Sequence, residues 1–120
     1  MEKLNFDFDK RIERVKDYLS TKNAIFINEY RDDKTIFSRL MYIYEDSLIN
    51  INILNYDENS LTIHYKYNDY ENNNNHLDSP TIEFSVQEIP AKMVHFERIM
   101  KKSFNFFVKI LKLYKEKYIR

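Results

Sequence analysis

The sequence predicts an α+β domain in which a single antiparallel sheet of four to five strands carries an N-terminal and a long C-terminal helix on one face. The last thirty residues, 91–120, repeat apolar side chains at helical spacing. Between about residues 48 and 87, apolar and polar residues alternate with a period of two, which is typical of strands with one buried face. A second and narrower stripe of apolar residues at helical spacing, near the N-terminus, predicts the other helix. We expect one domain spanning residues 1–120.

Residues 6–20 are predicted to form the first helix. Its apolar residues step by four, three and four positions, which places them on one narrow face: Phe8, Ile12, Val15 and Leu19. Acidic residues lie in the first turn, where the helix dipole favours them. The narrow stripe predicts a helix that lies on the surface of the core.

The segment at residues 35–44 satisfies two patterns. Its apolar residues have helical spacing, yet its β-branched and aromatic content suits a strand. Residues 24–30 are short, apolar and β-prone, and residues 31–34 read as a turn. We predict that residues 35–44 form a strand, because the two runs would then make a hairpin.

The remaining strands are marked by clear alternation. Ile49, Ile51 and Ile53 share one side of a strand over residues 48–54. The next two strands, separated by a polar loop at residues 68–80, place these residues on one side: Leu61, Ile63, Tyr65, Tyr67, Ile82, Phe84 and Val86.

Pro90 precedes the C-terminal helix, at the position where a helix tolerates proline. One apolar line runs along this helix: Phe96, Met100, Phe104, Phe107, Leu111, Tyr114 and Tyr118. Ile99, Phe106, Ile110 and Leu113 are expected to widen it until about half the circumference is apolar. The other half is basic, so we expect the helix to bury one broad face and to expose its lysines.

Composition excludes several kinds of chemistry. The chain has no cysteine, so it has no disulfide and no thiol nucleophile. It has no glycine, which excludes a glycine-rich phosphate loop and a Gly-x-Ser-x-Gly nucleophile. Turns that need a positive φ must therefore use Asn or Asp, the next most tolerant residues.

The three histidines do not form a recognisable metal or catalytic motif. His64 is expected on the polar side of a strand with Thr62 and Lys66, as a solvated side chain. His76 lies in an asparagine-rich loop, and His95 has no Glu or His four residues away. We predict no metal site, no cofactor and no enzymatic activity.

The N-terminal residues 1–8 are polar and acidic, unlike a secretory signal, and no window approaches the length of a membrane span. We therefore expect a cytoplasmic protein. Its net charge is zero, but the charges are segregated. Residues 40–90 hold one basic and nine acidic side chains, whereas residues 91–120 hold nine basic and two acidic ones.

This charge pattern, together with the tyrosines of the predicted strands, predicts a protein-binding protein. An acidic surface that carries tyrosines suits a basic protein target, as in an inhibitor or an immunity-type partner. The expected partner-binding residues are Glu45, Asp57, Glu58, Tyr67, Asp69, Tyr70 and Glu71. The alternative is a nucleic-acid-binding accessory protein that uses the basic C-terminal helix. A homodimer is compatible with the sequence.

Overall fold

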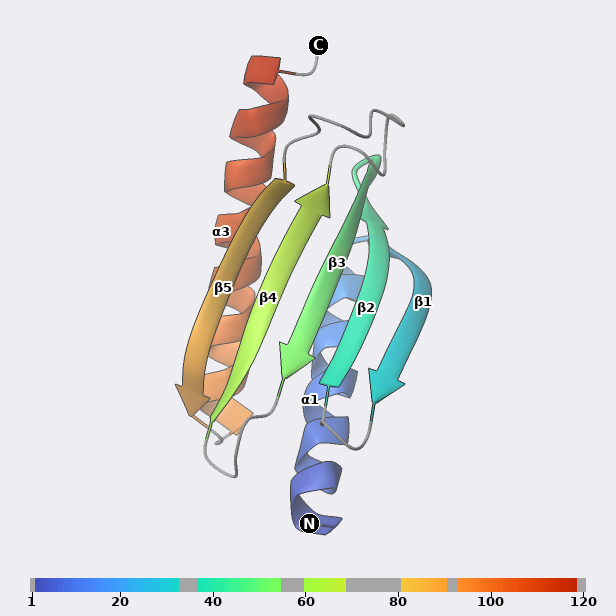
Figure 1. The fold of residues 1–120 in the computed structure, drawn as a ribbon, viewed down its shortest axis with the longest axis vertical. Helices are drawn as coiled ribbons and strands as arrows, with labels where there is room; N and C mark the ends of the chain where they lie inside the picture. Colours follow the sequence, from blue (N-terminus) through green and yellow to red (C-terminus); the bar gives the residue numbers. More distant parts are fainter. Residues whose placement is uncertain (1, 33–36, 55–59, 69–80, 91–92, 119–120) are drawn as a thin grey trace.

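The computed structural model describes residues 2–32, 37–54, 60–68, 81–90 and 93–118. These residues form two helices and five strands, drawn in Figure 1. In chain order they are α1 (Glu2–Thr21), β1 (Ile25–Asp32), β2 (Phe37–Tyr44), β3 (Ser47–Leu54), β4 (Ser60–Asn68), β5 (Thr81–Pro90) and α3 (Met93–Tyr118). The predicted α+β fold is confirmed, and the described part of the ambiguous segment, residues 37–44, is a strand.

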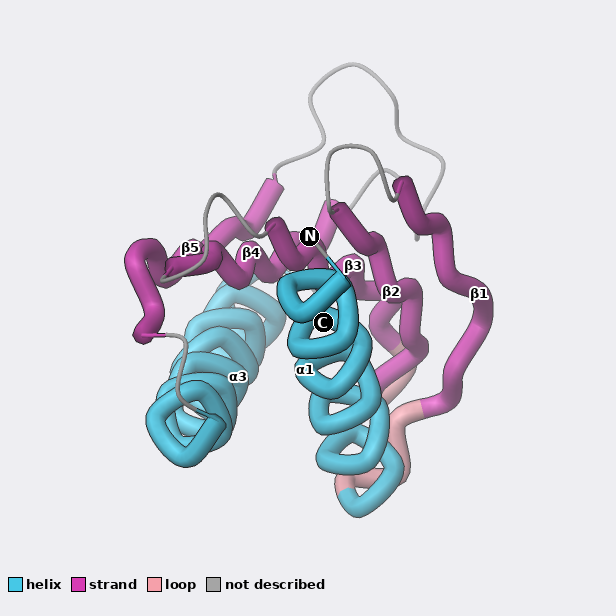
Figure 2. Tube along the Cα trace, turned by 90° about the horizontal axis from the view of Figure 1, so that it is seen from below, coloured by secondary structure: helices cyan, strands magenta, loops and turns pink. Residues whose placement is uncertain are grey.

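The strands form one antiparallel sheet in the order β1-β2-β3-β4-β5, so each strand pairs with its neighbour in sequence. Figure 2 shows α1 and α3 side by side on the same side of this sheet. We call the opposite side, which no described element covers, the open face. The expected arrangement of both helices on one face is thus confirmed.

The core lies between the sheet and the two helices. The predicted stripe of α1 is buried there: Phe8, Ile12, Val15 and Leu19. Five residues of the predicted line of α3 are also buried: Phe96, Met100, Phe104, Phe107 and Leu111. Tyr114 of the same line is partly buried, and the side chain of Tyr118 lies outside the described part of the chain. The inward side of the sheet is formed mainly by Leu40, Tyr42, Ile49, Ile51, Ile53, Leu61, Ile63, Tyr65 and Tyr67. Neither described helix carries an apolar stretch long enough to cross a membrane.

The apolar face of α3 is narrower than expected. Phe106 and Leu113 are exposed, because a helix lying on a sheet presents only one side to it and these residues lie on its flank. Phe106 nevertheless packs against Phe84 of β5, with 4.8 Å between the ring centroids.

Within the described residues, three positions have a positive φ, a conformation that glycine adopts most easily. Asn23 (φ 62°) follows the last residue of α1, and the amide of Ala24 donates to the carbonyl oxygen of Leu19, as in a helix cap with a left-handed residue. Glu45 (φ 47°) and Asp46 (φ 67°) form the two-residue turn between β2 and β3, which suits the primed turns of tight hairpins. Asn and Asp were expected at such positions, whereas a glutamate there is unusual.

Candidate interaction surface on the open face of the sheet

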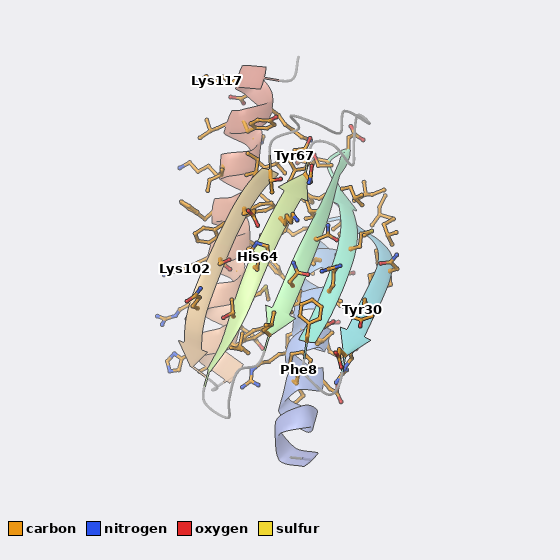
Figure 3. All side chains as sticks on the ribbon, viewed as in Figure 1. Phe8, Tyr30, His64, Tyr67, Lys102 and Lys117 are labelled. Carbon is orange, nitrogen blue, oxygen red and sulfur yellow. The ribbon has the colours of Figure 1, made fainter. Side chains whose placement is uncertain are left out.

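A row of polar side chains crosses the open face. Tyr30 of β1 lies opposite Arg39 of β2, Arg39 lies opposite Asn52 of β3, and Asn52 lies opposite His64 of β4. Because paired residues of neighbouring strands point to the same side of a sheet, all four belong to the open face. Figure 3, which looks onto this face, shows Tyr30 on β1 and His64 on β4.

A chain of hydrogen bonds runs along this row, from β2 through β3 and β4 to β5. The Nε of Arg39 donates to Oδ1 of Asn52 at 3.0 Å. Nδ2 of Asn52 lies 3.1 Å from Nδ1 of His64, and Nε2 of His64 lies 2.9 Å from Oε1 of Glu83 on β5. We call Arg39, Asn52, His64 and Glu83 the polar row.

The donor and acceptor roles within the polar row follow from its first member. Arg39 can only donate, so the amide oxygen of Asn52 faces it and the amide nitrogen of Asn52 faces His64. Nδ1 of His64 must therefore accept, which leaves the ring proton on Nε2, where it is donated to the carboxylate of Glu83. The hydrogen bonds of the row can therefore be assigned in one way only, with each donor pointing from Arg39 toward Glu83. This assignment fixes both the orientation of the Asn52 amide and the tautomer of His64.

This arrangement limits what His64 can do chemically. A general base or a metal-binding histidine needs a ring nitrogen with a free lone pair directed at the reacting group or the ion. In the polar row Nδ1 accepts from Asn52 and Nε2 donates to Glu83, so neither nitrogen is free. Among the described residues, no three His, Asp or Glu side chains gather into a group that could hold a metal ion. The row presents a fixed pattern of polar groups.

Two polar oxygens beside the row have no hydrogen-bond partner among the described residues. They are Oδ1 of Asn50 and Oγ1 of Thr62, whose side chains also point to the open face and are buried among their neighbours. An unpaired buried acceptor costs a fold about 1–3 kcal/mol. The fold therefore does not fully satisfy the polar groups of this face.

Of the residues predicted to bind a partner, Glu45 and Tyr67 lie in the described part of the chain. The side chain of Glu45 is exposed in the β2–β3 turn, and its carbonyl oxygen accepts a 3.4 Å hydrogen bond from Lys115. Tyr67 is 2% exposed and points into the core toward Tyr114, away from the open face. As folded here, its ring is not available to a partner.

The other predicted partner-binding residues lie outside the described residues: Asp57, Glu58, Asp69, Tyr70 and Glu71. The strand ends on either side of them are described. β3 ends at Leu54 and β4 begins at Ser60 at one end of the sheet, whereas β4 ends at Asn68 at the other (Figure 1). The two groups of acidic residues therefore follow strand ends on opposite ends of the sheet.

The basic surface of α3 lies on the helix side of the molecule. Its exposed cations include Arg98, Lys101, Lys102, Lys109 and Lys112, as the amphipathic pattern predicted. Phe106 stands between Lys102 and Lys109 at a spacing of four and three residues, and it is 47% exposed. Figure 3 shows Lys102 on the outer flank of α3.

Sequence reasoning placed His64 on the polar face but did not identify the polar row. A signal was available in the alternation itself, since Asn52, His64 and Glu83 each occupy a polar position of their strand. A scan against protein-family models, a search of curated proteins and a search of solved structures found no match for this chain.

Proposed function

We propose that this protein acts by binding another protein through the open face of its sheet, without catalysing a reaction. The observation that carries the proposal is the polar row, whose members hold one another in a single hydrogen-bonding pattern. Ordering a flexible side chain on binding costs roughly 0.5–1.5 kcal/mol. Side chains that the fold has already ordered avoid much of this cost, so a fixed polar surface suits recognition.

The residue types around the polar row also suit a protein interface. Tyrosine and arginine are enriched at the energetic centres of interfaces. Tyr30 is 57% exposed and lies next to Arg39.

The specific form of the proposal is an inhibitor or immunity-type partner of a basic protein. Glu83 supports a cationic partner, because its side chain is 53% exposed and only one of its carboxylate oxygens is engaged by His64. The acidic excess of residues 40–90 supports it as well, since opposite charges accelerate and orient association.

The proposal is tested by retention of a partner from the host on immobilised protein. We expect a host protein to bind to the immobilised wild type and not to Arg39→Ala, because this substitution removes the donor that orients Asn52. We expect weaker retention by Glu83→Gln, which removes the exposed charge. Lys101→Gln, on the helix side of the molecule, is the matched control. Equal retention by all three variants, with circular dichroism showing that each is folded, would exclude the open face.

The acidic residues outside the described part of the chain give a second test. Reversing Asp57, Glu58, Asp69 and Glu71 to lysine should slow association with the same partner. The effect should shrink as salt is raised, because exposed charges are screened beyond a Debye length of roughly 8 Å at physiological ionic strength. Unchanged association kinetics would remove these charges from the mechanism.

The alternative function, nucleic-acid binding by α3, is supported by the position of Phe106. An exposed aromatic ring between two lysines can stack on a base, a contact worth about 1–3 kcal/mol, while the lysines approach phosphates. If this function holds, micromolar and salt-dependent binding to single-stranded DNA or RNA should be lost on reversing Lys102, Lys109 and Lys112, and weakened by Phe106→Ala. No retention at physiological salt would leave α3 as a solvated helix face.

A further inference from the structure

β1 lies at one edge of the sheet, and all of its side chains are exposed or partly exposed. No described element lies beside this edge in Figure 2, so the strand presents backbone groups that no described strand pairs with. Its side chains include three successive exposed apolar residues, Ile25, Phe26 and Ile27, followed by the exposed Tyr30. An uncovered edge strand of this kind is a template for pairing with another strand.

A bulge divides β1 into two parts. Phe26 pairs with Tyr42 and Asn28 pairs with Met41, so Ile27 is an extra residue in the strand. Bulges bend a strand and interrupt its pairing, which makes the part that contains residues 25–27 a poor partner for a second strand. Residues 28–32 pair without interruption with β2 and form the regular part of the edge.

The regular part of β1 is self-complementary in an antiparallel sense. It reads Asn-Glu-Tyr-Arg-Asp, with Tyr30 at its centre. When two such segments are laid antiparallel about Tyr30, Glu29 of each lies opposite Arg31 of the other. Glu29 and Arg31 pair with Leu40 and Ser38 on the helix side of the sheet, so both point to the same side, as opposed residues must.

We propose that two copies of this protein dimerise by antiparallel pairing of β1 with β1 about Tyr30. The two-fold axis runs perpendicular to the sheet, so the helices of both copies lie on one side and both open faces lie on the other. Glu29 faces the partner's Arg31 twice, and the two Tyr30 rings meet at the axis on the open face.

The dimer extends the proposed binding surface, and this part of the inference rests on the proposed function. Tyr30 is in register with Arg39, Asn52 and His64, so the polar rows of the two copies meet through the paired tyrosines. One continuous polar surface would then cross both sheets. The dimer itself can be tested separately from the proposed function, because its detection needs only the purified protein and no partner.

The charged residues of the junction also have contacts within one copy. Glu29 binds Lys16 and Ser38, and Arg31 binds Asp9. A single charge reversal therefore disturbs the fold as well as the dimer. The double variant Glu29→Arg/Arg31→Glu separates the two effects: it restores opposite charges across the junction but places like charges against Lys16 and Asp9.

The first test is the molar mass measured by light scattering over a concentration series. We expect a dimer for the wild type, at least about tenfold weaker dimerisation for Arg31→Glu, and recovery of the dimer in the double variant. Recovery could not come from restored folding stability, because the contacts with Lys16 and Asp9 remain unfavourable. A monomeric wild type, or a double variant no better than Arg31→Glu, would overturn the proposal.

The second test is disulfide cross-linking. Because the chain has no cysteine, any disulfide between two copies must form between the introduced cysteines. Opposed residues of antiparallel strands have Cα atoms about 4.5–5.5 Å apart, within the range that a disulfide spans. Tyr30→Cys should therefore give a covalent dimer when an added oxidant accepts the two electrons. Ile25→Cys is the control: it is equally exposed on the same strand, but in this register the two copies of residue 25 lie roughly 33 Å apart. Equal cross-linking of both variants, or none of Tyr30→Cys, would overturn the register.

Discussion

Two adjacent phenylalanines of α3 provide a direct test of how this helix lies on the sheet. Phe107 is fully buried, and its ring stacks on Tyr65 with 5.4 Å between the centroids. Phe106 is 47% exposed and packs against Phe84. Removing a buried phenylalanine costs about 3–5 kcal/mol, of which an aromatic pair accounts for roughly 0.5–1.5 kcal/mol. A half-buried ring loses about half of the roughly 1.5–3 kcal/mol of its transfer free energy, or about 1 kcal/mol.

We therefore expect Phe107→Ala to lower the free energy of unfolding by about 4 kcal/mol and Phe106→Ala by about 1 kcal/mol. The measurement is urea denaturation followed by circular dichroism, with unchanged denaturant slopes showing that both variants unfold in the same way. Lys109→Ala, on the exposed side of α3, should change stability by about 0.5 kcal/mol or less. Equal losses for Phe106→Ala and Phe107→Ala would refute the orientation of the helix.

Burial raises the pKa of the Tyr65 phenol above its usual 10, and burial together with the nearby Glu29 raises that of Tyr42 to about 12. Above pH 10 the unfolded state loses these protons before the folded state does, so the free energy of unfolding should fall by about 1.4 kcal/mol per pH unit for each tyrosine. Tyr65→Phe should therefore reduce the slope of the free energy of unfolding against pH, measured by urea denaturation at pH 9–11. An unchanged slope would contradict this. Asn23 has a positive φ, which glycine adopts more easily and alanine less easily than asparagine. Asn23→Gly should therefore raise the free energy of unfolding, and with it the melting temperature, and Asn23→Ala should lower both, each change in free energy being about 0.5–1 kcal/mol. The opposite order would show that the cap is not left-handed.

Periodicity predicted the fold well because burial acts on every second or every third to fourth residue of an element. The alternation of Ile49, Ile51 and Ile53 required one buried face, and the stripe through Phe96, Met100 and Phe104 required another. The strand at residues 37–44 needed more than periodicity, since its apolar spacing suited a helix too. β2 lies between two strands, where β-branched and aromatic side chains pack well, and this tertiary context supports the strand.

The polar row was harder to predict, because it depends on registers between strands that no local pattern specifies. Its hydrogen bonds join residues 12 to 19 positions apart, and a shift of any strand by one residue would point its side chains to the other face. Tyr67 illustrates the opposite case. It alternates in phase with Ile63 and Tyr65, so the sequence alone indicates that it lies on their side of the sheet, in the core.

The two candidate functions occupy opposite sides of the molecule, and this separates them physically. The polar row lies on the side of the sheet that faces away from both helices. Lys102 and Lys109 are exposed on α3, which lies on the other side of the sheet (Figure 2). Figure 3 shows Lys102 on the outer flank of α3. A helix with its side chains is about 10–12 Å across, more than the Debye length of roughly 8 Å at physiological ionic strength. The lysines therefore exert little repulsion on a basic partner that approaches the open face. Reversing them should abolish any nucleic-acid binding and leave the binding of the proposed partner to the open face unaffected.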